Sequence, residues 1–276
     1  MSKNPACSPS GHMRAAAWTA AAVAIALTGG PAPSAAATGA PPLRYTAPPR
    51  AGRIDLLLRR DGPRVLLFDG GLEVASRDLG RLSSILIDGP DGPDTALTVD
   101  YASGAIPLPI DFHPGPLGPH TDNALTIRGG GASVERHIVT GAHAGVIELD
   151  GARIAYSNLT PINDTVSAAN FTFTAPATAT AINVNTGPAV SGFQTDQIND
   201  GGTSQFELIN FANKSNVTVN AAPSSGTALT VNISAAATGL ATLAVGGPAG
   251  STFDVQAVPA GITLGVNPTA NASVSI

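Results

Sequence analysis

Hydrophobic and polar residues alternate over short stretches along most of the chain, which is the period-two pattern of half-buried β-strands. Residues 229–233 show it well, because Leu, Val and Ile alternate there with Thr and Asn. After the N-terminal apolar run, helical periodicity nowhere extends beyond two turns. The pattern therefore predicts an all-β chain.

Gly, Pro and Asp divide the first half of the chain into short strands joined by tight turns. The strands predicted there are residues 53–58, 64–68, 72–76, 82–87, 138–139, 145–149 and 152–156. Asp150-Gly151 is a strong hairpin signal. Residues 106–120 are rich in Pro, which cannot donate to a central ladder, so we expect an edge or a loop there.

The second half is almost entirely strand and turn. Its predicted strands are residues 171–174, 179–185, 205–210, 217–219, 228–233, 240–245, 252–258 and 262–266. Two or three such strands per coil would give a repeat in the low-to-mid twenties, as in stacked β repeats. We therefore expect a parallel, β-helix-like β-solenoid whose outward Asn and Thr side chains form ladders. A β-sandwich, which also has short strands at this spacing, is the alternative.

Export is predicted by the N-terminus. Lys3 and Arg14 are followed by an apolar run and then by Ala35-Ala36-Ala37, the pattern of a cleaved signal peptide at residues 1–37. The run is too short for a membrane anchor. Cys7 is the only cysteine, so the mature chain would have no thiol for disulfides or thiolate chemistry. We expect a secreted, extracellular or cell-surface protein without an integral membrane segment.

The mature chain divides by pattern into three parts. The parts are a Pro/Ala-rich linker at residues 38–52, an irregular β region at 53–159 and a β-repeat solenoid at 160–276. Ordered structure is expected to begin near Arg53. The final strand-like run has no polar cap, so the repeats are expected to continue past the chain end.

Charged residues are few, at 12% of the chain against about 25% in an average soluble domain. The net charge is −5, which argues against nucleic acid as a partner. Aromatic residues are also scarce, at 4%, so the core must be built from small and β-branched side chains.

A turn with Gly, followed by Thr and a strand, recurs at residues 89–99, 115–127 and 246–255. It resembles the Gly-Gly-x-Gly-x-Asp nonapeptide of the repeats-in-toxin family, whose turn Asp residues and carbonyls bind Ca²⁺. Only the first copy keeps an acidic pair, so weak Ca²⁺ binding at Asp88, Asp91 and Asp94 is the metal hypothesis. The competing interpretation is that these turns are chosen only for positive φ angles.

Residues 53–258 more broadly resemble the N-terminal region of large, repeat-rich secreted bacterial surface proteins with degenerate repeats-in-toxin or haemagglutinin-like β repeats. Residues 239–258 match their repeat phrase best. The resemblance implies an exported structural or adhesive protein and transfers no catalytic residues. It implies surface polysaccharide or other cell-surface components as partners.

The residues that could act in catalysis are scattered along the sequence and form no recognisable catalytic motif. There is no Gly-x-Ser-x-Gly elbow, and Lys214 alone cannot make a basic groove for an anionic polysaccharide. The acidic residues considered as catalytic pairs stand singly: Asp55, Asp100, Glu148, Asp196 and Glu207. We therefore expect no enzymatic activity, no catalytic residues and no cofactor apart from the weak Ca²⁺.

Two other functions stay open from the sequence. One is a carbohydrate-binding or carbohydrate-active β-helix protein, with Tyr101, Tyr156 and Phe193 as the available aromatic platforms. The other is the Ca²⁺-binding repeat module.

The histidines lack the spacing of a zinc site. His113 and His120 lie in the Pro/Gly-rich stretch, and His137 and His143 flank a Thr-Gly-Ala turn. All are expected to be solvated loop residues.

Overall fold

The computed structural model describes residues 39–118, 122–221, 226–268 and 273–275. The predicted signal peptide lies outside these residues. In the described part the chain consists of β-strands and one 3₁₀ turn, η1 (Leu79–Arg81), and it contains no helix long and apolar enough to span a bilayer. The all-β prediction is confirmed.

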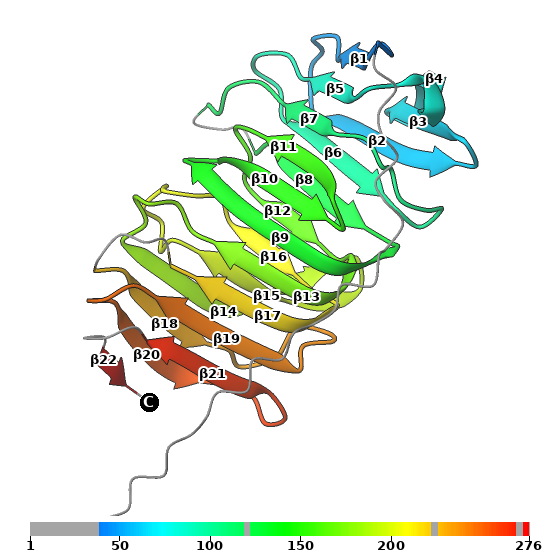
Figure 1. The fold of residues 1–276 in the computed structure, drawn as a ribbon. Helices are drawn as coiled ribbons and strands as arrows, with labels where there is room; N and C mark the ends of the chain where they lie inside the picture. The colour runs from blue at the N-terminus through cyan, green and yellow to red at the C-terminus, as the bar shows by residue number, and fades with distance from the viewer. Residues whose placement is uncertain (1–38, 119–121, 222–225, 269–272, 276) are drawn as a thin grey trace, which may run out of the picture. The chain divides into compact units, whose positions relative to one another are not determined.

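The described strands form two sheets (Figure 1). In spatial order, the ten strands of sheet A are β1 (Leu43–Thr46), β5 (Ile85–Asp88), β7 (Ile110–His113), β11 (Ala152–Tyr156), β10 (Ala144–Leu149), β9 (Gly131–Gly141), β13 (Ser167–Thr174), β17 (Lys214–Asn220), β19 (Thr242–Gly247) and β21 (Thr263–Pro268). The twelve strands of sheet B are β22 (Ser273–Ser275), β20 (Thr252–Ala257), β18 (Ala228–Asn232), β14 (Ala181–Val190), β15 (Phe193–Asn199), β16 (Ile209–Phe211), β12 (Ile162–Asp164), β8 (Ala124–Arg128), β6 (Thr95–Asp100), β2 (Ile54–Asp61), β3 (Arg64–Asp69) and β4 (Leu72–Asp78).

From β17 onward the chain changes sheet after every strand. From β19 onward, each strand pairs in parallel with the strand two places earlier in the sequence. In sheet A, Val217 pairs with Leu243, and Leu243 pairs with Leu264. In sheet B, Leu229 pairs with Phe253. These partners are separated by about the repeat length that the sequence predicts.

Among the described strands, antiparallel pairing occurs only in three runs that each stay in a single sheet: β9–β10–β11 in sheet A, and β2–β3–β4 and β14–β15–β16 in sheet B. The hairpins predicted at residues 53–76 and at Asp150-Gly151 are among them, so these predictions are confirmed. All other pairings between the described strands are parallel. A sandwich of two antiparallel sheets, the alternative interpretation, does not have this pattern.

The core lies between the two sheets. Phe171 from sheet A stacks on Phe211 from sheet B, with ring centroids 5.4 Å apart. Parallel pairing places like side chains next to each other along the core, as with Phe171, Val217 and Leu243. Strands from both sides of residue 160 share both sheets, since β8 pairs with β12 and β9 with β13.

Three sequence predictions need correction. Ordered structure begins before Arg53, because β1 lies within the Pro/Ala-rich segment and pairs with β5. The Pro-rich stretch contains β7, a strand inside sheet A between β5 and β11, because its prolines flank the paired residues and none lies within them. The strand β15 was not predicted, since Gly187-Pro188 interrupts the pattern of β14, where the pairing with β15 shifts register.

Two of the recurring Gly-Pro turns lie directly against each other. A Cβ atom at Gly89 would lie 2.5 Å from the carbonyl oxygen of Pro114, and one at Gly115 would lie 2.5 Å from that of Pro90. The Gly89 amide donates to His113 O at 2.8 Å. The repeated glycines are therefore required by close contact between successive turns.

Gly89→Ala should lower the free energy of unfolding by about 1–3 kcal/mol, because its methyl group would force adjacent backbone apart. Gly141→Ala is the control, since a Cβ there has no neighbour within 4 Å and no positive φ is required. Its effect should stay within about 0.5 kcal/mol. Urea unfolding measures both variants, and equal effects would contradict the packing argument.

Candidate functional site: a buried charged cluster

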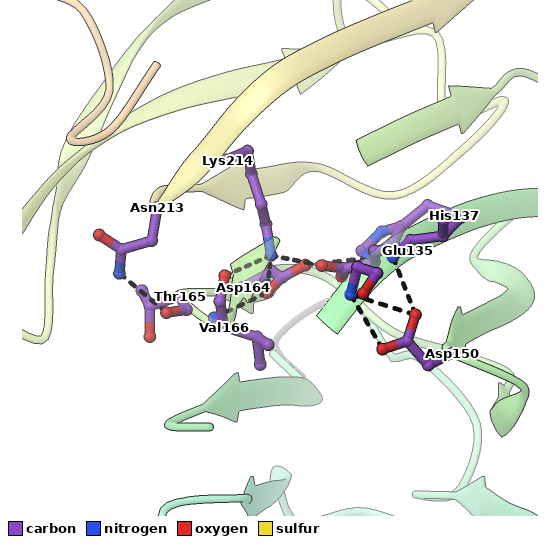
Figure 2. Close-up of polar contacts among 10 residues, drawn as sticks. Glu135, His137, Asp150, Asp164, Thr165, Val166, Asn213 and Lys214 are labelled. Carbon is purple, nitrogen blue, oxygen red and sulfur yellow. Dashed lines mark hydrogen bonds and ion pairs between the residues drawn. The ribbon is translucent and has the colours of Figure 1, made fainter. Parts of the chain in front are cut away.

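Two successive crossings from sheet B to sheet A bring Asp164 and Lys214 together (Figure 2). Asp164 is the last residue of β12, and Lys214 is the first residue of β17. Asn213, at a φ of 61°, turns the chain just before Lys214. Its side-chain amide donates to Thr165 O at 2.9 Å, which ties the second crossing to the first.

The strand β9 supplies two further groups. Glu135 and His137 lie four and two residues before Val139, respectively, and all three are buried on the same face. In the parallel ladder, Glu135 pairs with Phe171 and His137 pairs with Phe173. Charged groups therefore occupy positions that the next strand fills with aromatic rings.

Lys214 is the hub of this charged cluster, which consists of Glu135, His137, Asp164 and Lys214. Its Nζ donates hydrogen bonds to Glu135 Oε2 at 2.5 Å, Asp164 Oδ1 at 2.8 Å and Val166 O at 2.7 Å. His137 Nε2 lies 3.1 Å from Glu135 Oε1 and 3.1 Å from Asp164 Oδ2. The four charged or titratable side chains all have 0% exposure.

Burial and neighbouring charges act in opposite directions on the cluster. Burial alone would raise the pKa of Asp164, but the Lys214 charge and the hydrogen bonds to Glu135 and His137 together hold that pKa well below its ordinary value. Burial raises the pKa of Glu135, and the Asp164 charge adds to the effect. Burial alone would lower the pKa of His137, but hydrogen bonds to Asp164 and Glu135 raise it to about 9. Glu135 is thus the carboxyl group that most readily takes up a proton.

The donor set also has to be considered as a metal site. In the part of the chain that the structure describes, Glu135, His137 and Asp164 are the one group of three His, Cys, Asp or Glu residues whose ligand atoms lie within 4.8 Å of one another. The ammonium group of Lys214, however, bridges the two carboxyl groups. A metal ion bound there would face this positive charge at contact distance, so the lysine serves as the cation of the cluster.

Aromatic rings surround the charges. Lys214 Nζ lies 5.6 Å from the centroid of the Phe171 ring. The Tyr101 hydroxyl is buried nearby, and burial, together with the charges of Glu135 and Asp164, raises the pKa of Tyr101. Tyr101 and Val166 also line a cavity of about 240 Å³. The charged groups themselves have no exposed surface, so a solute cannot reach them in this conformation.

A buried tyrosine–carboxyl pair, Tyr156 and Glu207, lies close to the charged cluster. The Tyr156 hydroxyl donates to Glu207 Oε1, and burial raises the pKa of Glu207 to about 7. Burial also raises the pKa of Asp196 to about 7. These carboxyl groups hold their protons more tightly in the folded chain than in the unfolded chain.

The predicted Ca²⁺ ligands lie elsewhere, around the turn between β5 and β6. Asp88 ends β5, Asp91 is exposed in the turn, and Asp94 precedes β6. The Asp94 carboxylate accepts a hydrogen bond from the Asp122 amide at 2.8 Å. Asp88, Asp91 and Asp94 do not form a group of ligand atoms within 4.8 Å of one another, as three residues of the charged cluster do. Ca²⁺ binding by Asp88, Asp91 and Asp94 stays a prediction.

The prediction of solvated histidines is wrong for His137, which is fully buried. His113 and His143 lie outside the core and bond to Ser157 Oγ and Leu159 O, respectively, while His120 lies outside the described residues. Period-two counting back from Val139 could have found Glu135 and His137. Their meeting with Asp164 and Lys214 depends on pairing between distant strands.

Two of the proposed aromatic platforms are also wrong. Tyr101 and Tyr156 are core residues, exposed by only 6% and 3%. Phe193 begins β15 and is half-buried. The three rings therefore do not form an exposed binding surface together.

Comparisons of the chain with protein-family models, with curated proteins and with solved structures find no match. The function has to be argued from the geometry of the molecule itself.

Stability should fall as the pH rises from about 4 to about 7, because the folded chain binds more protons than the unfolded chain in that range. The raised pKa values of Glu207 and Asp196 contribute stability that is complete below their ordinary values of 4.5 and 3.8 and is lost as the pH passes about 7. Glu207→Gln should flatten this dependence in urea-unfolding measurements. Glu148→Gln, on the outer face of sheet A, should leave it unchanged, and a stability that rises over the range would contradict the assignment.

Proposed function

We propose that the chain folds as a β-solenoid and serves as a secreted structural or adhesive cell-surface protein without catalytic activity. The observation that supports this most directly is the alternation of β17 to β22 between the two sheets, with parallel pairing throughout. Each round of chain adds one strand to each sheet. Such stacking gives a stiff backbone-bonded structure, which suits a mechanical role.

An amide ladder on sheet B supports the same proposal. It consists of Asn163, Asn210, Gln197, Asn199 and Asn183. Successive side chains are joined by hydrogen bonds of 2.9, 3.0, 3.0 and 3.2 Å across four neighbouring strands. This is the outward stacking of polar residues that the sequence predicts, and it stabilises the strand pairing from outside the core.

The location of the charged cluster favours a non-catalytic role. Its carboxyl groups are fully buried, whereas an acid–base pair needs to come within hydrogen-bond distance of a substrate. The cluster is better suited to holding the chain together than to turning over a solute.

Carbohydrate binding is the second candidate, and one groove favours it. Part of the amide ladder, Asn163, Gln197 and Asn210, lines a groove of about 460 Å³ together with Arg53 and Asp122. Side-chain amides donate and accept hydrogen bonds at once, as sugar hydroxyls also do. This groove is the surface where a polysaccharide of the cell surface would bind.

The cellular location of the protein tests the proposal that it is secreted or exposed at the cell surface. Antibodies against the folded chain should label intact, unpermeabilised cells of the organism that encodes it, or the protein should collect in the medium. Label that appears only after permeabilisation would contradict a secreted or surface role.

Measurements of polysaccharide binding test whether the groove beside the amide ladder is the binding surface. Binding of the purified chain to immobilised surface polysaccharides should weaken by about 2- to 10-fold in Asn163→Ala, which removes a partly exposed amide from the groove, as expected for one lost hydrogen bond. Asn216→Ala is the matched control, because Asn216 bonds to Ala169 O from sheet A and lies outside the groove. Equal losses in both variants would argue that the groove is not the binding surface.

A further inference from the structure

We propose that the folded chain joins Lys214 to Asp164 by an amide bond between Nζ and Cγ, with loss of one water molecule. Nζ lies 2.8 Å from Asp164 Oδ1, so the amine is one bond away from the carbon that it would attack. Both side chains have 0% exposure. The inference does not depend on an adhesive role.

An amine and a carboxyl group do not condense in water, because both are charged and hydrated there. The core changes both conditions. Burial opposes both charged forms, but the attraction between them still keeps the pKa of Asp164 low and that of Lys214 high. The reactive neutral amine therefore arises when Lys214 passes a proton to Glu135, which its Nζ contacts. Burial also removes the solvent, while the fold holds the two groups at a fixed contact distance. The nearby ring of Phe171, 5.6 Å from Nζ, contributes to these apolar surroundings.

Asp164 is the carboxyl group better arranged to be attacked. Its Oδ1 accepts a hydrogen bond from the Val166 amide at 3.1 Å, which would stabilise negative charge developing on that oxygen. Its Oδ2 lies 3.1 Å from His137 Nε2, a donor to the oxygen that must leave. Val166 also positions the amine, since its carbonyl oxygen accepts from Lys214 Nζ.

Glu135 is placed to move the protons. Its Oε2 lies 2.5 Å from Lys214 Nζ, and its raised pKa allows the carboxyl group both to accept and to return a proton. Its Oε1 faces the same His137 nitrogen that contacts Asp164 Oδ2, at 3.1 Å. A continuous path therefore connects the attacking nitrogen with the leaving oxygen.

The step balances without any other reactant. The Nζ lone pair forms a C–N bond with Asp164 Cγ, and the bond from Cγ to Oδ2 breaks. Two of the three ammonium protons leave with Oδ2 as water, and the third stays on the amide nitrogen. Glu135 and His137 end in the protonation states in which they began.

The bond would connect the end of β12 in sheet B with the start of β17 in sheet A. These residues are 50 positions apart, so the link would close a long loop across two crossings of the chain. A cross-link of this kind restricts the unfolded chain and prevents the two sheets from separating at this point.

Trypsin digestion of the denatured, full chain tests the proposal. Lys214 is the only Lys or Arg in residues 154–276, so an unlinked chain is cut into fragments 154–214 and 215–276. An amide at Nζ blocks that cut. We expect one fragment, 154–276, lighter than its sequence by one water molecule. A folded wild-type chain that is cut at Lys214 would overturn the proposal.

A Glu-specific protease locates the bond. It separates Asp164, in fragment 149–207, from Lys214, in fragment 208–276, and the proposed link would hold these two fragments together. A link from Lys214 to the region of Glu135 instead would overturn the assignment of Asp164.

Three variants test the roles of Lys214, Glu135 and Asp164 in forming the amide bond. Lys214→Met should give fragment 154–276 at its full mass, and Glu135→Gln, folded by circular dichroism, should be cut at Lys214. Because Glu135→Gln could also fail to fold, Asp164→Asn provides an independent check. It should lose ammonia instead of water and reach the same fragment mass as the wild type. A folded Glu135→Gln chain that is fully linked would overturn the role given to Glu135.

Discussion

Parallel backbone pairing between successive passes of the chain is the constraint on which the rest of this structure depends. It places each inward side chain beside the corresponding side chain of the next pass, as with Phe171, Val217 and Leu243. It also places turn against turn, which leaves no room for a Cβ atom at Gly89. Because the contacts repeat from one pass to the next, a chain with few aromatic residues can still build a continuous core.

The charged cluster is the main departure from that apolar core. Taking ionised groups out of water costs several kcal/mol per ion, and only close pairing and hydrogen bonds offset the cost. Here the offset comes from the Lys214 ammonium, which contacts two carboxyl groups and a backbone carbonyl. The cluster also lies where two crossings meet, so its contacts hold the two sheets in position relative to each other.

Much of the local structure could be predicted from the sequence, and the failures have specific causes. The hairpin at Asp150-Gly151 was recognisable because its turn chemistry is local. The strand β7 was missed because two prolines precede it, and β15 was missed because a proline interrupts its partner. Lys214 was not recognisable as a core residue, because it is out of phase with Val217 and Val219, where the ladder between β13 and β17 is irregular.

The sequence by itself determined that this chain forms short β-strands, where most of them turn and which residues of a regular strand share a face. These properties depend on neighbouring residues, which the period-two pattern and the turn residues report directly. Only the tertiary structure decided which strands pair and therefore which charges meet. Lys214 contacts Glu135 and Asp164 from 79 and 50 positions away. The two hairpins inserted between these residues account for part of the separations, and a local pattern contains no information about the partner of a strand.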